Sequence, residues 1–370
     1  MIFRIDELKD VCGVILAAVD SSIDSVINET IELKVENNQF TLNVTNREYY
    51  VKVKLGISSE EEFHATVNAN LFLKLISKIT TDTVELKIDD TNLIVIGNGR
   101  YKIPMIYDGV NLLTLPEISI LNATVNFPIK STVLKSINKY NTKQLSTGTI
   151  VNPIQKKYYI DENGAITFTS GACINKFSLQ NKVSMLLDSK LVKLFNLFKD
   201  DIDINFTLGY DSITENIIQT KVKFETNIVT ITSILSSDDT LIKKFPVSTI
   251  RDKVFEDYEY SVVINKEELI QTIDRLLLFP TNYNNRMYSN LIFEKTQVLI
   301  YDSSEENNEA IYYSNESSIN DSYKAKLDLN DLKAALSSFS SQYVTMRFGN
   351  FSSIVIFVGD IYYLIPEVSS

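Results

Sequence analysis

Six stretches with apolar residues at helical spacing recur along the chain at a nearly constant interval. They start about sixty residues apart, with one longer interval before residue 267, which indicates an internally repeated unit. Unrelated helices would not keep such an interval. The six predicted helices span residues 7–19, 70–79, 131–140, 189–198, 267–277 and 330–339.

The sequence between these helices has the pattern of short strands. Apolar and polar residues alternate in Ile31–Val35, Val84–Ile88 and Val222–Thr226. Polar turns such as Asp89–Asn92 and Asp161–Gly164 separate such strands at hairpin spacing. The pattern therefore predicts an α+β fold in which helices pack on antiparallel sheets.

Each predicted repeat unit is one helix with several strands, in the order βαβββ. Two units give about 120 residues, the size of a typical domain, so the 370 residues predict three similar domains. Linker-like sequence near residues 115–123 and 245–253 sets the expected boundaries. The predicted domains are residues 1–122, 123–252 and 253–370.

The charge balance limits how this protein can bind nucleic acid. The chain has 36 Lys and Arg against 47 Asp and Glu, a net charge of −11. This excludes a strongly basic surface that binds DNA tightly, but it allows a local basic lining. Two distant cysteines, Cys12 and Cys173, exclude a disulfide framework. The acidic N-terminus and the absence of a long apolar run predict a cytoplasmic protein without a membrane span.

Catalytic motifs are scarce. His64 is the only histidine and lies in a strand pattern, and Gly97–Arg100 lacks the third glycine of a dinucleotide site and is typical of a hairpin turn. Two carboxylate runs, Asp200–Asp203 and Asp302–Glu306, have the character of solvated loops. A metal-dependent nuclease built from scattered carboxylates stays open as one alternative.

Lysine pairs mark one face of three predicted helices. Lys74 and Lys78 are four residues apart, as are Lys135 and Lys139, and Lys190 and Lys193 are three apart. Such spacing places both charges of a pair on one helical side. Any single pair is compatible with an ordinary solvated face.

Several stretches, in this order and at this spacing, resemble the bacterial beta sliding clamp, the processivity subunit of the DNA polymerase III holoenzyme. The resemblance extends over essentially the whole chain, and a divergent or phage-encoded member is compatible with it. It rests on residues 65–76, 82–86, 97–103, 327–336, 344–348 and 362–366.

The resemblance implies a ring-shaped, head-to-tail homodimer that encircles duplex DNA without reading its sequence. The ring tethers the catalytic subunit of the replicative DNA polymerase, which makes synthesis processive. The protein is then not an enzyme and needs no cofactor, because ATP belongs to the separate clamp loader. Short peptides of polymerase and loader bind an apolar cleft between domains 2 and 3.

The resemblance also assigns residues to three surfaces. The expected peptide cleft comprises Tyr158, Tyr159, Ile160, Thr169, Gly171, Ile174, Pro246, Tyr363, Leu364, Ile365 and Pro366. The expected DNA-facing residues are Lys74, Lys78, Lys135, Lys139, Lys190, Lys193 and Lys333. The expected dimer contact joins Tyr101 and Ile103 to Leu278 and Phe279.

The C-terminus departs from the family pattern, which commonly has Met and Arg around the last proline. This chain has Ile365, Glu367 and Val368 there, so its preferred peptide can differ. A β-rich structural or adhesion protein with stacked domains is a further alternative. Among clamps, the six predicted helices favour three domains and a dimer over the two-domain trimers of eukaryotes.

Overall fold

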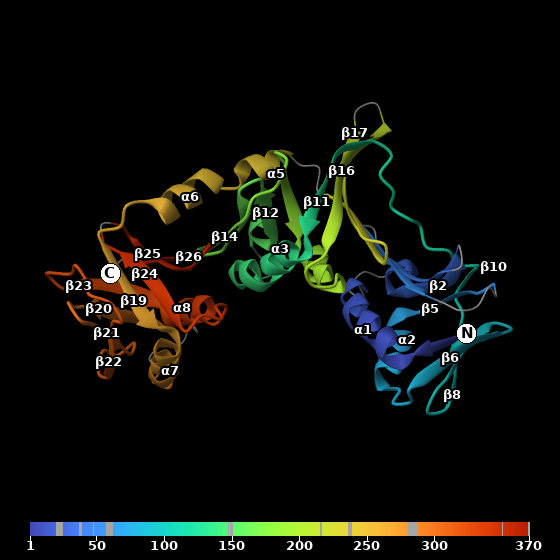
Figure 1. Ribbon diagram of the computed structural model, residues 1–370, viewed down its shortest axis with the longest axis horizontal. Helices are drawn as coiled ribbons and strands as arrows, with labels where there is room; N and C mark the ends of the chain where they lie inside the picture. Colours follow the sequence, from blue (N-terminus) through green and yellow to red (C-terminus); the bar gives the residue numbers. More distant parts are fainter. Residues whose placement is uncertain are drawn as a thin grey trace. The chain divides into compact units, whose positions relative to one another are not determined.

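The computed structural model describes the chain in two compact units (Figure 1). The first unit comprises residues 1–135 and 187–238, and the second comprises residues 136–186 and 239–370. The structure describes residues 1–19, 25–36, 39–46, 48–56, 62–146, 148, 151–214, 217–235, 239–279, 287–349 and 351–368.

The first unit contains two antiparallel sheets and a small hairpin, β9 (Tyr107–Asp108) with β10 (Asn111–Leu112). The four-stranded sheet has the order β1 (Ile2–Arg4), β6 (Thr83–Asp89), β7 (Asn92–Ile96), β8 (Arg100–Pro104). The eight-stranded sheet has the order β11 (Ala123–Lys130), β16 (Asp203–Thr214), β17 (Ile217–Glu225), β18 (Val229–Ile234), β4 (Tyr49–Gly56), β3 (Gln39–Thr45), β2 (Thr30–Glu36), β5 (His64–Asn68).

Helix α2 (Ala69–Lys78) shows why these segments are helical. The side chain of Asn68 accepts a hydrogen bond from the Leu71 backbone N–H, which caps the first turn. Phe72 and Ile76 are buried at i, i+4 spacing, so one stripe of the helix packs on the sheet. The other helices of this unit are α1 (Ile5–Ile15), α4 (Ser189–Leu194) and most of α3 (Ser131–Ser136).

The second unit also has one eight-stranded and one four-stranded sheet, both antiparallel. The large sheet has the order β15 (Ser184–Asp188), β12 (Lys157–Asp161), β13 (Gly164–Phe168), β14 (Ala172–Lys176), β26 (Ile361–Pro366), β25 (Ser353–Val358), β24 (Tyr343–Phe348), β19 (Tyr260–Asn265). The small sheet has the order β22 (Asn308–Tyr312), β21 (Gln297–Tyr301), β20 (Tyr288–Phe293), β23 (Tyr323–Asp328).

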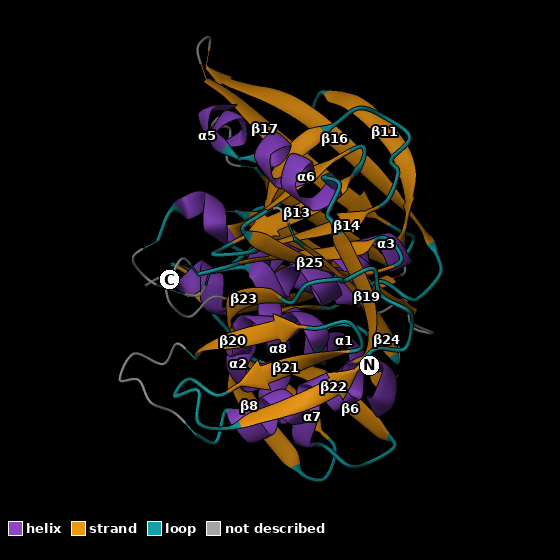
Figure 2. Ribbon diagram, turned by 90° about the vertical axis from the view of Figure 1, so that its left-hand side faces the viewer, coloured by secondary structure: helices purple, strands orange, loops and turns teal. Residues whose placement is uncertain are grey.

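Two helices and both sheets of the second unit enclose its main core. Helices α7 (Lys266–Leu276) and α8 (Leu329–Leu336) pack against each other and against strands of both sheets (Figure 2). Buried residues such as Ile273, Leu332 and Phe348 form this core. Two shorter helices, α5 (Asp239–Lys244) and α6 (Val247–Phe255), precede β19.

Each eight-stranded sheet joins strands that are far apart in the sequence. In the first unit, residues 49–53 of β4 pair with residues 229–233 of β18. In the second, residues 172–175 of β14 pair with residues 361–364 of β26, and these strands lie side by side in green and red in Figure 1. Non-local strand pairing therefore completes both large sheets.

The α+β fold class predicted from the sequence is confirmed, and each of the six predicted helices coincides with a helix. Three of them continue into tighter or wider helical turns, η1 (Leu16–Ala18), η3 (Ile137–Asn141) and η6 (Phe195–Leu197). Helices α5 and α6 were not predicted, and α6 occupies the stretch expected to be a linker. Three further short turns are η2 (Val26–Glu29), η4 (Thr142–Gln144) and η5 (Pro153–Lys156).

The three predicted domains do not coincide with the two compact units. The predicted limit before residue 123 coincides with the start of β11, whereas the limit after residue 252 falls inside α6. The boundary between the units runs through the predicted middle domain. The three-domain division therefore stays a prediction. No helix of the described residues is long and apolar enough to span a membrane.

Candidate functional site

An apolar cluster covers the face of the large sheet opposite α7 and α8 in the second unit. Strand alternation separates the two faces: Ala172, Ile174 and Leu364 point to this cluster, whereas Cys173 and Tyr363 point to the main core. We call it the α6 cluster, because Ile250 and Val254 of α6 complete it. Its buried residues are Ile154, Tyr159, Ile166, Ala172, Ile174, Leu186, Phe245, Ile250, Val254, Val355 and Leu364.

Aromatic rings organise the α6 cluster around Phe245. The ring of Tyr159 stacks on Phe245 at a centroid distance of 5.1 Å, and Phe168 meets Phe245 edge-on at 5.0 Å. Half-buried apolar residues surround the cluster and form the surface that a partner can reach. They are Phe168, Leu241, Ile242, Val247, Tyr258, Phe357 and Tyr362.

Some of the predicted cleft residues meet at this cluster. Tyr159, Ile174 and Leu364 belong to it. Gly171 lies against β26: a Cβ atom there would come within 2.3 Å of the Leu364 carbonyl oxygen, so only glycine allows this approach. Pro246 is half-buried at the start of α6.

The other predicted cleft residues lie at its rim or away from it. The Thr169 hydroxyl donates to the Gln144 side chain at 2.8 Å, and Pro366 is half-buried at the end of β26. Tyr158 is fully buried and its hydroxyl lies 2.7 Å from that of Thr142. Ile160, two residues along β12, is also buried outside the cluster.

Tyr363 and Ile365 differ most from the expectation. Both belong to the main core, where the Tyr363 hydroxyl donates to the Tyr140 carbonyl oxygen at 2.8 Å. Since side chains alternate along a strand, the residues of β26 on the face of the α6 cluster are Tyr362 and Leu364.

Sequence reasoning missed several members of the cluster. Val355, Ile154 and the α6 residues Ile250 and Val254 were not predicted, and Pro246 was selected in place of its neighbour Phe245. The i, i+4 spacing of Ile250 and Val254 is the signal that could have found α6.

The predicted DNA-facing lysines fall into two groups. Lys74, Lys78, Lys139 and Lys193 are exposed, and Lys190 is half-buried at the start of α4. The other two are neutralised by carboxylates, because their Nζ atoms lie 2.5 Å from a carboxylate oxygen: Lys135 pairs with Asp200, and Lys333 pairs with Asp274.

The predicted dimer residues differ in how far they are exposed. Leu278 and Phe279 follow α7 and are 74% and 50% exposed. Tyr101 is 37% exposed on β8, an edge strand, but Ile103 on the same strand is 2% exposed and lies in the core. Ile103 therefore supports the edge strand from inside rather than offering a contact. The corresponding edge strand of the second unit is β22, where Tyr312 is 66% exposed.

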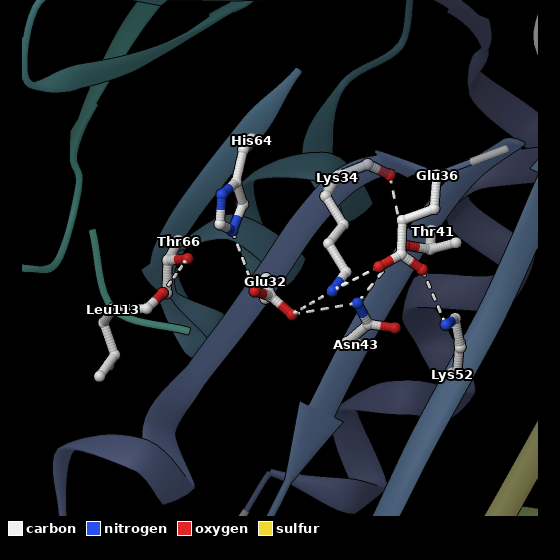
Figure 3. A network of polar contacts seen from close by, with 9 residues as sticks. All are labelled: Glu32, Lys34, Glu36, Thr41, Asn43, Lys52, His64, Thr66 and Leu113. Carbon is white, nitrogen blue, oxygen red and sulfur yellow. Dashed lines mark hydrogen bonds and ion pairs between the residues drawn. The ribbon is translucent and has the colours of Figure 1, made fainter. Parts of the chain in front are cut away.

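His64 takes part in a partly buried polar network on the first unit's large sheet (Figure 3). Its Nε2 lies 2.9 Å from Oε1 of Glu32, a fully buried carboxylate that also accepts from Asn43 at 3.2 Å. Lys34 contacts both Glu32 and Glu36. Burial opposes ionisation of Glu32, but the bond to His64 and the charge of Lys34 outweigh it and lower its pKa.

The remaining chemistry-bearing groups are structural. Burial raises the pKa of the Cys12 thiol to about 12 and that of Cys173 further, so neither is a reactive thiolate. Asp302 is buried and accepts hydrogen bonds from Ser304 and Asn307, which order its loop. The described residues contain no group of three or more His, Cys, Asp or Glu side chains that could hold a metal ion.

The fold of this chain is the one seen in bacterial DNA sliding clamps. Solved structures with the same fold include the beta subunits of DNA polymerase III from Pseudomonas aeruginosa (15% identity, TM-score 0.80) and Thermotoga maritima (14%, 0.81), each covering 100% of this chain and 99% of that chain. The sliding clamp of Bacillus subtilis is 17% identical with a TM-score of 0.78, and the match covers 100% of this chain and 98% of that one.

Residues 4–117 match the family described as DNA polymerase III beta subunit, N-terminal domain. This match and the shared fold bear out the resemblance seen in the sequence. No curated protein sequence matches the chain significantly.

Proposed function

We propose that this protein is a sliding clamp that encircles duplex DNA as a homodimeric ring and tethers the replicative DNA polymerase. The observation that carries the proposal is the sliding-clamp fold over the whole chain, together with a β subunit N-terminal domain. A closed ring stays on DNA by topology, so it holds the polymerase at high effective concentration without tight contacts. The protein acts in the cytoplasm and is not an enzyme.

The exposed lysines support weak, sequence-independent contact with DNA. Lys74 and Lys78 lie four residues apart on α2, and neither has an ion-pair partner among the described residues. Contacts of this kind go to phosphate oxygens and carry no sequence information. Lys135 and Lys333 add little positive charge, since each already pairs with a carboxylate.

Two edge strands support ring closure by dimerisation. β8 and β22 each end a four-stranded sheet, and an unpaired edge offers backbone N–H and C=O groups to a second chain. Tyr101 on β8 and the pair Leu278 and Phe279 supply exposed apolar surface for the contact. Two such contacts, related by symmetry, close a ring of two chains.

The α6 cluster is the proposed binding surface for short peptides of the polymerase and the clamp loader. Half-buried Val247, Phe168 and Tyr362 offer apolar area around a rigid buried centre. Surfaces of this kind bind peptides through a few aliphatic or aromatic anchors. From β26, the predicted residue Leu364 and its unpredicted neighbour Tyr362 contribute to this surface, whereas Tyr363 and Ile365 belong to the main core.

Retention on circular DNA tests the proposal. We expect the protein to stay with the polymerase on nicked circular DNA during gel filtration and to leave when the circle is linearised. Light scattering should give twice the chain mass of 42.0 kDa. Retention that ignores linearisation, or magnesium-dependent cleavage of the circle, would contradict encirclement and favour an adhesive or nucleolytic role.

A further inference from the structure

A row of stacked aromatic and cationic side chains adjoins the α6 cluster. We call its five members the aromatic–cation row: one cation lies at each end, and three aromatic rings lie between them. The row consists of Lys176, Phe255, Tyr362, Phe357 and Arg347.

Each neighbouring pair in the row is in direct contact. The Lys176 Nζ lies 5.1 Å from the centroid of Phe255 and 5.9 Å from that of Tyr362. Phe255 meets Tyr362 edge-on at 5.1 Å, and Tyr362 stacks on Phe357 at 5.3 Å with 17° between the rings. The Arg347 guanidinium lies 4.4 Å above the centroid of Phe357.

The row continues the surface of the α6 cluster. Tyr362 and Phe357 both pack against the cluster, and Val254 of the cluster precedes Phe255. Along β14, Lys176 has the same parity as Ala172 and Ile174, which places it on the same face of the sheet. A peptide bound on the cluster can therefore extend onto the row.

The row is open to a partner. Lys176 is exposed and Phe255 is 43% exposed at the end of α6, while Tyr362, Phe357 and Arg347 are half-buried. The three aromatic rings and Arg347 are of residue types that are enriched in protein-binding surfaces.

The two cations of the row lack carboxylate partners among the described residues. In contrast, Arg251 of α6 is held by Asp161 at 2.7 Å. The carboxylates of Glu256 and Asp360, next to the row in the chain, form no ion pair with Lys176 or Arg347 in the described part of the structure. Two cations that lie over aromatic rings without a carboxylate partner can attract a negatively charged ligand, even in a chain with net charge −11.

Stacking on the aromatic rings also orients both cations for binding to a carboxylate. A guanidinium that lies on a ring keeps the N–H groups at its edge free to donate, and the ring reduces the side-chain entropy lost on binding. We propose that the aromatic–cation row binds acidic residues that flank the apolar anchors of partner peptides. The inference rests on the proposed peptide-binding role of the α6 cluster. It adds that the bound peptides carry negative charge beside their apolar anchors.

Three matched peptides test the charge preference. Each carries the same central Leu and Phe anchors, flanked on both sides by two Glu, two Gln or two Lys, and binding is measured by fluorescence anisotropy at 50 and 300 mM salt. We expect the Glu peptide to bind about tenfold more tightly than the Gln peptide at low salt, because charge-assisted hydrogen bonds form, with the preference shrinking at high salt.

A charge reversal in the row makes the test specific. In the variant Lys176→Glu with Arg347→Glu, we expect the preference to invert, so that the Lys peptide binds best while the Gln peptide keeps its affinity. Lys295→Glu is the matched control, because Lys295 is an exposed lysine of the same unit outside the row, and it should leave the order of the peptides unchanged.

The outcomes separate this inference from the proposed function. If the Gln peptide binds and the Glu peptide gains nothing, the row has no charge role, although the cluster still binds peptides. If the charge-reversed variant keeps the wild-type preference for the Glu peptide, residues outside the row bind the acidic flanking residues, and the inference is wrong. If none of the three peptides binds, the proposed peptide surface is wrong, and the proposed charge role of the aromatic–cation row is then wrong as well.

Discussion

Arg275 on α7 and Glu309 on the edge strand β22 form a bidentate ion pair. The Arg275 Nε lies 2.8 Å from Oε1 of Glu309, and Nη2 lies 2.5 Å from Oε2. The Ser303 hydroxyl donates to the Phe279 carbonyl oxygen at 3.5 Å from the loop that precedes β22. These contacts hold the exposed pair Leu278 and Phe279 beside the strand edge.

Replacing Leu278 and Phe279 with Asp should give monomers, because two charges would be desolvated in the proposed dimer contact. Sedimentation equilibrium at several concentrations measures the effect. An unchanged dimer mass would place these residues outside the interface.

Arg275→Met should weaken the dimer more gently, by about tenfold in Kd, since the variant keeps the apolar residues but releases them from β22. Gln271→Met is a suitable control, because Gln271 is an exposed, uncharged residue of the same helix. Equal dimer strength in both variants would show that the ion pair does not position the contact.

Lys74→Gln with Lys78→Gln should reduce the salt dependence of DNA binding. Each phosphate contact contributes about 0.9 to the slope of log K against log salt concentration, so losing both reduces the slope by about 1.8. Lys333→Gln serves as control and should change the slope less, because Asp274 already neutralises this lysine. An equal change of the slope in both variants would show that the lysines of α2 contact DNA no more than Lys333 does.

Val247→Asp should lower the affinity of an anchor peptide at least tenfold, because a charge replaces half-buried apolar surface beside the α6 cluster. Isothermal titration measures the loss, and an unchanged dimer mass shows that folding is intact. A variant that binds as wild type would move the peptide site elsewhere. Deleting residues from Ile365 onward would not test the peptide site, since Ile365 belongs to the main core.

Asp211→Asn should destabilise the first unit by about 2 kcal/mol at pH 7. Asp211 accepts from Lys221 at 2.8 Å and from the backbone N–H groups of Leu121 and Asn122 at 3.0 Å, and Lys221 also donates to the Ser119 carbonyl oxygen. The pair therefore fixes the segment that leads into β11. Urea unfolding of the wild type and the variant measures the difference.

The same residue predicts a pH dependence. The hydrogen bond from Lys221 lowers the pKa of Asp211 below its value in the unfolded chain, which is about 3.9. Its contribution to stability is present above the unfolded pKa and is lost as the pH falls through the folded pKa. The difference between wild type and Asp211→Asn should therefore shrink between pH 5 and pH 2, and a constant difference would contradict the pairing.

Helix positions were predictable because packing on a sheet requires an apolar stripe, which a periodic sequence displays directly. Phe72 and Ile76 of α2 are an example: their spacing alone indicates both the helix and its buried face. Strand alternation gave β2 and β6 in the same way.

The face of β26 was harder to predict. Tyr362, Tyr363, Leu364 and Ile365 are all apolar, since the strand is covered on both sides, so no alternation marks which residues face the α6 cluster. The pairing of Lys135 with Asp200 was also hidden, because 65 positions separate these residues and only the fold brings them together. The periodicity of a short segment predicts its own secondary structure. Which residues form a site depends in addition on contacts between segments that are far apart in the sequence.

The long-range pairing of β4 with β18 has a consequence during synthesis. Residues 49–53 emerge from the ribosome long before residues 229–233, so β4 remains an open edge while the intervening chain is made. A truncated fragment such as residues 1–122 keeps that edge permanently and has an unsatisfied strand available to any other copy. The nascent N-terminal part of this chain is thus at greatest risk of self-association before residues 229–233 have been translated.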